Sequence, residues 1–321
     1  MNKYFIKKDP YFSVILPFKR NGDIDYKVHF KYLDFFYKNG VRNFYLMLYN
    51  SRLGLLNENE SLEVNNRTAN YLKKKYKKKV YFIGAEKFEG SADETLDRIK
   101  KLNKNVDAFS IIFGEKFYNE NQVYNYFKYI NRKTSKDLLF HMQMMMNGHG
   151  IDPPIVNYSS NLVQKICRLN KIKFIKEDAK IHRLTLNIIK KVKNNSIIIK
   201  SGGGMSVWKN YKKYGCHTWL VGIELLNPKL AFDFLQNLKN KEFLKNLEEK
   251  IEKPFFSEVK KYGWHIFLKA CLEYMNLMKR YERLPLQEVN SKEYKKICIF
   301  MKKLRHNSIK YLGYDYFKPV K

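Results

Sequence analysis

Cysteine is scarce in this 321-residue chain, and its thiols lie far apart. The four cysteines are Cys167, Cys216, Cys271 and Cys298, and none forms a CxxC pair, so neither a disulfide framework nor a metal site is predicted. No apolar run approaches membrane-spanning length, and the N-terminal stretch MNKYFIKKDPYF lacks the apolar segment of a signal peptide. We therefore expect a soluble, cytoplasmic protein without a membrane partner.

Acidic residues are also few. The chain has 31 Asp and Glu against 62 Lys and Arg, which gives a formal net charge of +31. Such a charge is typical of proteins that bind nucleic acid or anionic membranes. The lysines are spread along the chain beside many Asn, Ile, Tyr and Phe residues, a composition that AT-rich codon usage also produces. We predict no specific nucleic-acid partner, and a polyanion-binding role stays open as a weaker alternative.

Short apolar segments, by contrast, are abundant. Hydrophobic residues make up 45% of the chain and aromatic residues 16%, which is enough for a large core. Eight segments have strand length and many β-branched or aromatic residues. They cover residues 12–18, 43–49, 80–85, 107–113, 138–143, 172–177, 196–202 and 218–223.

Segments of helical period lie between these expected strands. Residues 26–40 place Val28, Tyr32, Leu33 and Phe36 on one face, and residues 91–105 open with a sequence like a capping box. Nearly continuous apolar strands that alternate with helices predict a parallel sheet covered by helices. Eight such units match a (β/α)₈ TIM barrel. A doubly wound open sheet is the competing fold, but no GxGxxG follows the first strand.

The pattern changes after about residue 228. Residues 231–240, 256–281 and 291–313 are all helical in period, and no further strand is predicted. We therefore expect a barrel over residues 1–229 and a C-terminal all-helical extension over residues 230–321.

One lysine stands at the end of the sixth expected strand. Lys176 follows Phe174 by two residues, so both side chains lie on the same face of the strand. Working groups of such barrels lie at the C-terminal ends of the strands. If this face points inward, the amine is desolvated and becomes a nucleophile. If it does not, Lys176 is a solvated surface charge, and spacing alone leaves both alternatives open.

Four motifs follow one another along the chain. They are VILPFKRNGDIDYKVHFKYLDFFYKNGV (14–41), LLNENE (55–60), FIKED (174–178) and SGGGMSVWKNYKKYGCHTWLVGIELLNP (201–228). In these motifs and their order the chain resembles the dihydrodipicolinate synthase and N-acetylneuraminate lyase family of class I aldolases, from about residue 12 to residue 228. The helical tail is also where the family has one.

The resemblance implies a function. It places Lys176 at the family's Schiff-base lysine. It implies a lyase or aldolase that acts on pyruvate or a related 2-keto acid, sugar-derived ones included, without a metal or organic cofactor. It also implies a homo-oligomer, either a dimer or a tetramer.

The chain departs from the family pattern around that lysine. The family holds the keto-acid carboxylate with a G-T-T/S-G-E turn after the second strand, and here the turn is LYNSR (48–52), from which Asn50 and Ser51 are the candidate binding residues. The position of the family's proton-relaying tyrosine is held by His141. This histidine is either a general acid–base or a hydrogen-bonded interior residue. Tyr49 is a second candidate, as a phenol that enters the pocket from the second strand.

For four further candidate substrate-binding residues, a purely structural role is the alternative. Phe117 and Tyr118 follow the fourth strand where the family has a PYY sequence, and they either line the site and a subunit contact or pack on the surface. Gly202 and Gly203 follow the seventh strand and either let a ligand or phosphate approach or form a tight turn.

One replacement bears on the substrate. The family's second-carboxylate arginine aligns with Met146 or Asn147, which argues against the dihydrodipicolinate reaction itself. The alternative to an enzyme is a barrel that has lost the reaction and acts as a ligand-binding or interaction protein.

Overall fold

The computed structural model describes residues 9–86, 90–112, 119–142, 158–179 and 181–320. The chain groups into two compact units, which are described separately. The barrel unit comprises Met1–Ser13, Arg42–Gly202 and Val207–Leu220, and the helical unit comprises Val14–Val41, Gly203–Ser206 and Val221–Lys321. The expected domain boundary after residue 229 stays a prediction, because compact groups of contacts need not coincide with domains that fold independently.

The barrel unit contains a closed ring of eight parallel strands. They are β1 (Tyr11–Ser13), β2 (Asn43–Tyr45), β3 (Tyr81–Ala85), β4 (Ala108–Ile112), β5 (Asp137–His141), β6 (Ile172–Glu177), β7 (Ile197–Lys200) and β8 (Thr218–Trp219). Each strand pairs with the next in sequence, and a parallel bridge between Tyr11 and Leu220 joins the first strand to the end of the last. The expected TIM barrel is confirmed.

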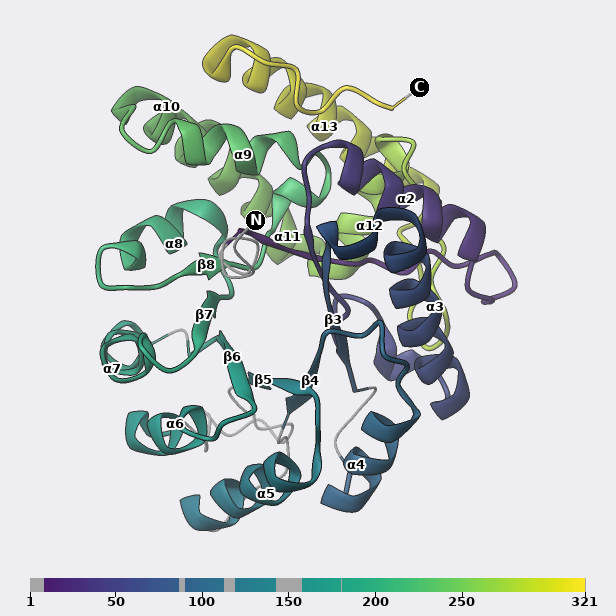
Figure 1. Ribbon diagram of the computed structural model, residues 1–321. Coiled ribbons are helices and arrows are strands. Elements are labelled where there is room, and N and C mark those ends of the chain that lie inside the picture. The colour runs from purple at the N-terminus through teal and green to yellow at the C-terminus, as the bar shows by residue number, and fades with distance from the viewer. Residues whose placement is uncertain (1–8, 87–89, 113–118, 143–157, 180, 321) are drawn as a thin grey trace. The chain divides into compact units, whose positions relative to one another are not determined.

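The helices of this unit alternate with the strands. They are α3 (Glu58–Tyr76), α4 (Ala92–Lys101), α5 (Glu120–Lys133), α6 (Ser160–Cys167), α7 (His182–Val192) and the greater part of α8 (Gly204–Lys212), with the short turns η1 (Leu53–Leu55) and η2 (Lys77–Lys79). Figure 1 shows α4 to α7 on the outside of the strands. At the start of α4 the Ser91 hydroxyl accepts from the Glu94 N–H and the Glu94 carboxylate accepts from the Ser91 N–H, so the expected capping box is confirmed.

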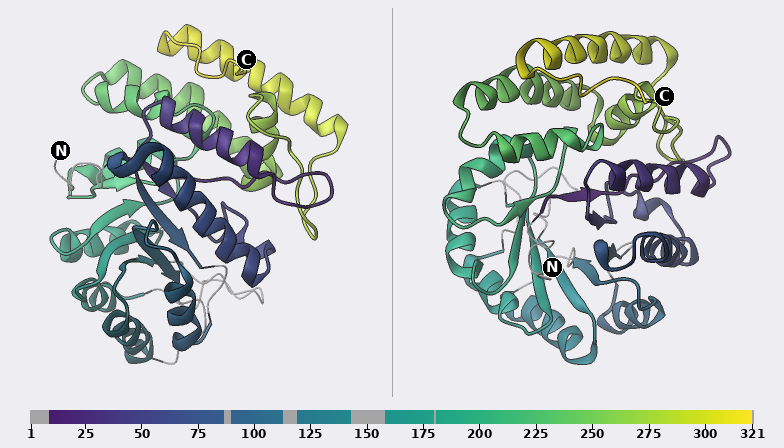
Figure 2. Two further views of the ribbon diagram at one scale, coloured as in Figure 1. Left: turned by 45° about the vertical axis from the view of Figure 1, so that its right-hand side comes forward. Right: turned by 45° about the horizontal axis from the view of Figure 1, so that its top comes forward.

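The helical unit confirms that the strands stop near residue 228. It contains α2 (Tyr26–Lys38), η3 (Ile223–Leu225), α9 (Lys229–Gln236), α10 (Lys241–Asn246), the π-helical segment η4 (Leu247–Glu252), α11 (Lys253–Tyr262), α12 (Trp264–Tyr274) and α13 (Ser291–Leu312). The last helix, α13, contacts α10 and α12, and it is the yellow helix of Figure 2. In α2 the buried side chains are His29, Tyr32, Leu33 and Phe36, so His29 takes the place expected for Val28.

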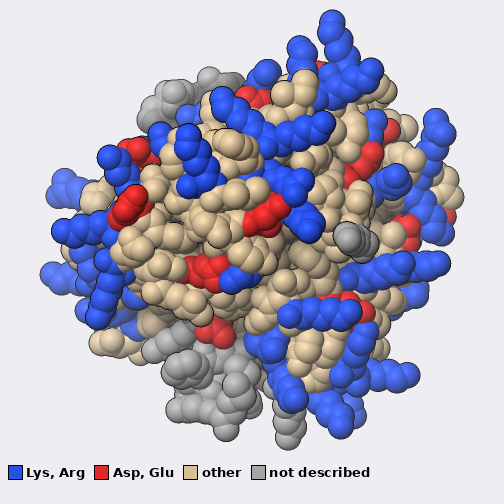
Figure 3. Space-filling view, turned by 90° about the horizontal axis from the view of Figure 1, so that it is seen from above, with Lys and Arg blue, Asp and Glu red and all other residues tan. Residues whose placement is uncertain are grey.

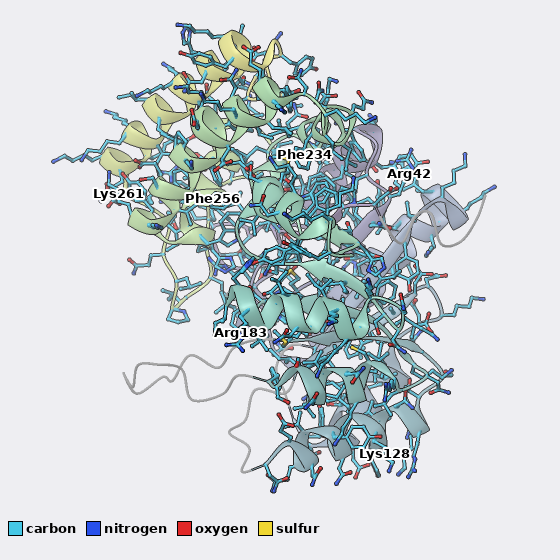
Figure 4. All side chains as sticks on the ribbon, turned by 90° about the vertical axis from the view of Figure 1, so that its left-hand side faces the viewer. Arg42, Lys128, Arg183, Phe234, Phe256 and Lys261 are labelled. Atoms are coloured by element: carbon cyan, nitrogen blue, oxygen red, sulfur yellow. The ribbon has the colours of Figure 1, made fainter. Side chains whose placement is uncertain are left out.

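Positive side chains are spread over the face of the molecule that Figure 3 shows. Lys and Arg side chains are scattered across this face and are most frequent toward its edges, with fewer Asp and Glu side chains among them. Figure 4 labels Arg183, an exposed residue of α7, Lys128 of α5 and Lys261 at the end of α11. Among the helices that the structure describes, none is long and apolar enough to cross a membrane.

Candidate functional site

The interior of the barrel fixes the direction in which β6 points its side chains. The ring of Phe174 on β6 lies 6.1 Å from that of Tyr11 on β1 and 5.5 Å from that of Tyr81 on β3. Strands β1 and β3 are not neighbours of β6 in the sheet, so these rings meet across the inside of the barrel. Side chains two residues apart on a strand share a face, and Lys176 therefore also points inward.

Lys176 is buried in this position. Its residue is 2% exposed, although β6 ends one residue later. The strand is paired on both sides, with His141 of β5 and Ile199 of β7 beside Lys176. The alternative that Lys176 is a solvated surface charge is therefore wrong. The side chain of Lys173, on the same strand, points to the opposite face and is exposed.

The amine of Lys176 lies against the imidazole of His141. Lys176 Nζ is 2.9 Å from His141 Nε2, and His141 is itself only 2% exposed. Burial, followed by the charge of Lys176, holds the pKa of His141 well below its usual 6.5. The imidazole is therefore neutral near pH 7. It accepts a hydrogen bond from the ammonium at Nε2, and this arrangement places the ring proton on Nδ1.

Asp178 completes this group from the same chain segment. Its Oδ2 lies 3.0 Å from Lys176 Nζ, and its side chain is 14% exposed. The sequence prediction named no role for Asp178. The signal was present, because Asp178 follows Lys176 by two residues and so continues the inward face of β6. The three side chains that meet here are called the Lys176 cluster: His141, Lys176 and Asp178.

A second lysine next to β6 has a structural role. Lys200 Nζ lies 2.7 Å from Glu177 Oε2, and both side chains are buried. Glu177 Oε1 also accepts from the Thr185 hydroxyl of α7, at 2.9 Å. Because Glu177 and Lys176 are consecutive, they point to opposite faces of the strand. This ion pair therefore lies between the strands and their helices, outside the barrel interior.

The polar side chains of the turn after β2 form hydrogen bonds within the protein. Asn50 Nδ2 donates to Ser13 Oγ of β1 at 3.1 Å. Ser51 is fully buried, and its hydroxyl accepts from the Met47 N–H at 2.9 Å, so Ser51 closes the turn on itself. Arg52 follows with a φ of 58°, in the left-handed region. Substrate binding by Asn50 and Ser51 stays a prediction.

The phenol that the structure buries on β2 is Tyr45. The predicted proton carrier Tyr49 is 44% exposed, and its role stays a prediction. Tyr45, four residues earlier, is fully buried, and its hydroxyl lies 2.7 Å from Ser110 Oγ of β4. Burial raises the pKa of Tyr45, so the phenol stays neutral. The sequence contained Tyr45 within the second strand, but only the strand register shows that it shares the inward face.

The glycine turn after β7 is occupied by a carboxyl group of the chain itself, that of Glu252. Within the helical unit, Glu252 Oε1 accepts from the Met205 N–H at 2.8 Å, and Oε2 accepts from the Ser206 N–H at 3.2 Å and from the Ser206 hydroxyl. Burial, then the charge of Glu224, raises the pKa of Glu252 to about 8. A Cβ on Gly204 would lie 2.3 Å from Glu252 Oε1. The first N–H groups of α8 are thus already bonded, which favours the tight-turn alternative over a phosphate site.

The remaining candidates divide by position. Gly202 and Gly203 have φ values of 75° and 91°, which require glycine in practice, and their substrate contacts stay a prediction. Phe117 and Tyr118 lie outside the described residues. In the part of the chain that the structure describes, no group of three or more His, Cys, Asp or Glu side chains is placed to hold a metal ion.

Comparison with known proteins identifies relatives of the whole fold. The model of the dihydrodipicolinate synthetase family matches residues 11–304. No curated protein matches the chain. Solved structures match at low identity, and such a likeness shows the fold alone.

Three solved structures illustrate the likeness. A dihydrodipicolinate synthase from Thermotoga maritima is 19% identical, with a TM-score of 0.76, over 92% of this chain and 98% of that one. The 4-hydroxy-tetrahydrodipicolinate synthase from Methylacidiphilum fumariolicum SolV is 17% identical, with a TM-score of 0.78, over 95% and 98%. A structure described as the first monomeric dihydrodipicolinate synthase variant is 18% identical, with a TM-score of 0.76, over 94% and 98%.

Proposed function

The chain belongs to the dihydrodipicolinate synthetase family, and from that premise we propose that it is a class I aldolase or lyase that forms a Schiff base on Lys176. Its substrate in this proposal is pyruvate or a related 2-keto acid. The observation that carries the proposal is the position of Lys176, an amine 2% exposed on the inward face of β6, with a neutral imidazole 2.9 Å away. No cofactor takes part in the proposed reaction.

The first step of the proposed mechanism activates the amine. An ammonium has no lone pair, so Lys176 must lose a proton before it attacks a carbonyl carbon. His141 Nε2 lies along the existing hydrogen bond and is unprotonated near pH 7, so it takes this proton as a general base. The free amine then adds to the keto carbon of the substrate, and one of its two protons passes to the keto oxygen, which becomes the hydroxyl of a carbinolamine.

The later steps use the same proton. The imidazolium of His141 protonates the hydroxyl of the carbinolamine, which leaves as water, and a protonated imine remains on Lys176. This cation withdraws electrons from the adjacent carbon, so that a carbon–carbon bond to that carbon is made or broken. Water then hydrolyses the imine, releases the keto acid and returns the amine. Tyr45 and Ser110 provide hydroxyl groups on the facing strands, and these stay neutral.

Trapping the imine tests this proposal directly. We expect incubation with pyruvate or a sugar-derived keto acid, followed by borohydride, to add the reduced keto acid to the peptide that contains Lys176, as seen by mass spectrometry. Lys176→Arg keeps the charge but cannot form the imine, and it should give no adduct at this position. If no keto acid gives an adduct on the unmodified chain, the enzyme proposal is wrong.

The alternative, a barrel that binds a ligand without turnover, has its own support. The polar side chains of the turn after β2 are bonded within the protein, Asn50 to Ser13 and Ser51 to Met47. A keto acid that stabilises the protein in a thermal shift assay, but leaves no adduct after borohydride, would favour this alternative.

Two further properties remain proposals. We propose a homo-oligomer, a dimer or a tetramer, which sedimentation velocity would resolve from a monomer. A cytoplasmic location is likewise proposed.

A further inference from the structure

Asp178 lies where it can control the charge on Lys176 throughout the reaction. We propose that Asp178 is a positioning residue whose carboxylate holds Lys176 as an ammonium in the resting site and then pairs with the protonated imine. The second half of this inference rests on the proposed function, whereas the first half concerns the free protein.

The contacts of Asp178 are directed at the amine. Oδ2 lies 3.0 Å from Lys176 Nζ, and the exposed fractions of the two side chains are 14% and 3%. The other oxygen, Oδ1, is buried and accepts no hydrogen bond from the described residues. The charge of this carboxylate is therefore not shared with another donor there, and a carboxylate at this distance stabilises the charged form of an amine.

Four other ionisable groups near Lys176, on β5, β6, β1 and β3, do not supply this negative charge. On β5, His141 is neutral. On β6, Glu177 directly follows Lys176, points to the opposite face of the strand and is paired there with Lys200 of β7 at 2.7 Å. Inside the barrel, the phenols of Tyr11 and Tyr81 contact Phe174, and burial raises the pKa of each, so both are neutral.

The polar side chains of the helices that cover β6 have other partners. On α7, Thr185 donates to Glu177, and His182 shares a hydrogen bond with the Tyr211 hydroxyl of α8 at 2.9 Å. Both of these contacts lie on the helix side of the sheet. Asp178 thus places a carboxylate directly against the amine.

In the proposed reaction, one positive charge lies near the Asp178 carboxylate at each stage. In the resting site the positive charge is on Lys176. When the proton moves to His141, the charge moves with it and stays within the cluster. When the carbonyl oxygen leaves as water, it carries one proton from the amine nitrogen and the proton from His141, and the positive charge is on the imine nitrogen. One cation is present at every stage, and Asp178 stabilises all three.

Replacing Asp178 should therefore change the acidity of the amine. In Asp178→Asn the ammonium loses its anionic partner but keeps the hydrogen bond to His141. We expect the pH at which Lys176 becomes nucleophilic to fall by about one to three units, the range typical of an opposite charge this close. Asp178→Glu keeps the charge and should restore most of the unmodified behaviour, which a purely steric role would not predict.

Competitive acetylation measures this property without any keto acid. The unmodified chain and its variants are treated with trace acetic anhydride over a range of pH, and the acetylation of each lysine is followed by peptide mass spectrometry. The matched control is Asp107→Asn, because Asp107 forms a partly exposed ion pair with Lys73, at 2.5 Å, elsewhere in the barrel unit. We expect its Lys176 profile to equal that of the unmodified chain.

The outcomes separate the two proposals. An unchanged Lys176 profile in Asp178→Asn would overturn the role of Asp178, as would an equal shift in Asp107→Asn. If Asp178→Asn does not fold, the smaller Asp178→Ser carries the same test. If the profile shifts as expected while the unmodified chain forms no borohydride adduct with any keto acid, the role in holding the ammonium stands and the proposed function fails.

Discussion

The substitution Lys176→Met tests how the buried cluster is held together. It replaces the amine with an unbranched apolar side chain of similar length, and it leaves the Asp178 carboxylate without its cation. At an effective dielectric constant of about 20, two unit charges 3.0 Å apart attract each other by roughly 5 to 6 kcal/mol. Desolvation of the two groups offsets part of this attraction. Removing one partner of a buried pair typically lowers the free energy of unfolding by about 3–5 kcal/mol.

We therefore expect Lys176→Met to lower the free energy of unfolding in urea by about 3 kcal/mol or more at pH 7. The double variant Lys176→Met with Asp178→Asn removes both charges, and it should recover more than half of this loss. The pair of Lys73 and Asp107, whose side chains are 17% and 26% exposed respectively, provides the comparison, and for Lys73→Met with Asp107→Asn we expect a smaller coupling. A loss below about 1 kcal/mol in Lys176→Met would refute the reasoning, since the carboxylate would then be solvated or protonated at no cost.

Four further predictions concern three residues, His141, Glu252 and Gly204. His141→Gln should slow imine formation at neutral pH by about 10²- to 10⁴-fold, measured as the rate of adduct trapping; a change below threefold would mean that another group takes the proton. Below pH 6.5 the imidazole of His141 binds a proton in the unfolded state but not in the folded state. The free energy of unfolding of the unmodified chain should therefore fall, relative to that of His141→Gln, by up to about 1.4 kcal/mol for each pH unit below 6.5. Because the pKa of Glu252 is raised to about 8, its contribution to stability is complete below pH 4.5 and lost as the pH rises to 8. In urea, the free energy of unfolding of Glu252→Gln should therefore increase relative to that of the unmodified chain between pH 4.5 and 8. A constant difference over this range would contradict the assignment. Gly204→Ala, whose Cβ would meet Glu252 at 2.3 Å, should lower the melting temperature more than Gly263→Ala, which has a similar φ and no atom within 4 Å; equal effects would show that backbone conformation alone matters.

Tyr45 and Tyr49 differ in a property that the sequence pattern does not give, their position relative to the end of strand β2. Both belong to the apolar segment NFYLMLY, and alternation alone does not say where the strand ends. In the structure β2 ends at Tyr45, the Leu46 N–H still donates to the Ile83 carbonyl of β3, and a turn begins at Leu48. Tyr45 is consequently buried against Ser110, whereas Tyr49 is 44% exposed. Strand ends are set by pairing with neighbouring strands, which a single segment does not specify.

Asp178 shows a related limit. The pattern of Phe174, Lys176 and Asp178 at every second position contained the information that these three residues share a face. What the pattern did not contain was the direction of that face. The rings of Tyr11 and Tyr81, from strands distant in sequence, supply the direction, because they contact Phe174 across the barrel.

The sequence by itself determined the order of elements and the class of fold. Eight apolar segments separated by amphipathic helices, followed by helices alone, predict parallel α/β units with a helical tail, because local periodicity and strand composition are properties of short segments. Their number favours a TIM barrel over a doubly wound sheet, and the bridge between Tyr11 and Leu220 shows the closure. It also singled out Lys176, through its spacing and the motifs around it.

Only the tertiary structure decided what surrounds that lysine. It buried the amine, brought His141 from β5 to 2.9 Å, set Asp178 at 3.0 Å and moved Glu177 to the other face with Lys200. It also filled the start of α8 with Glu252, a residue 47 positions away from Met205. These contacts join residues that are distant in sequence or depend on the direction of a face, and both are fixed only when the chain folds.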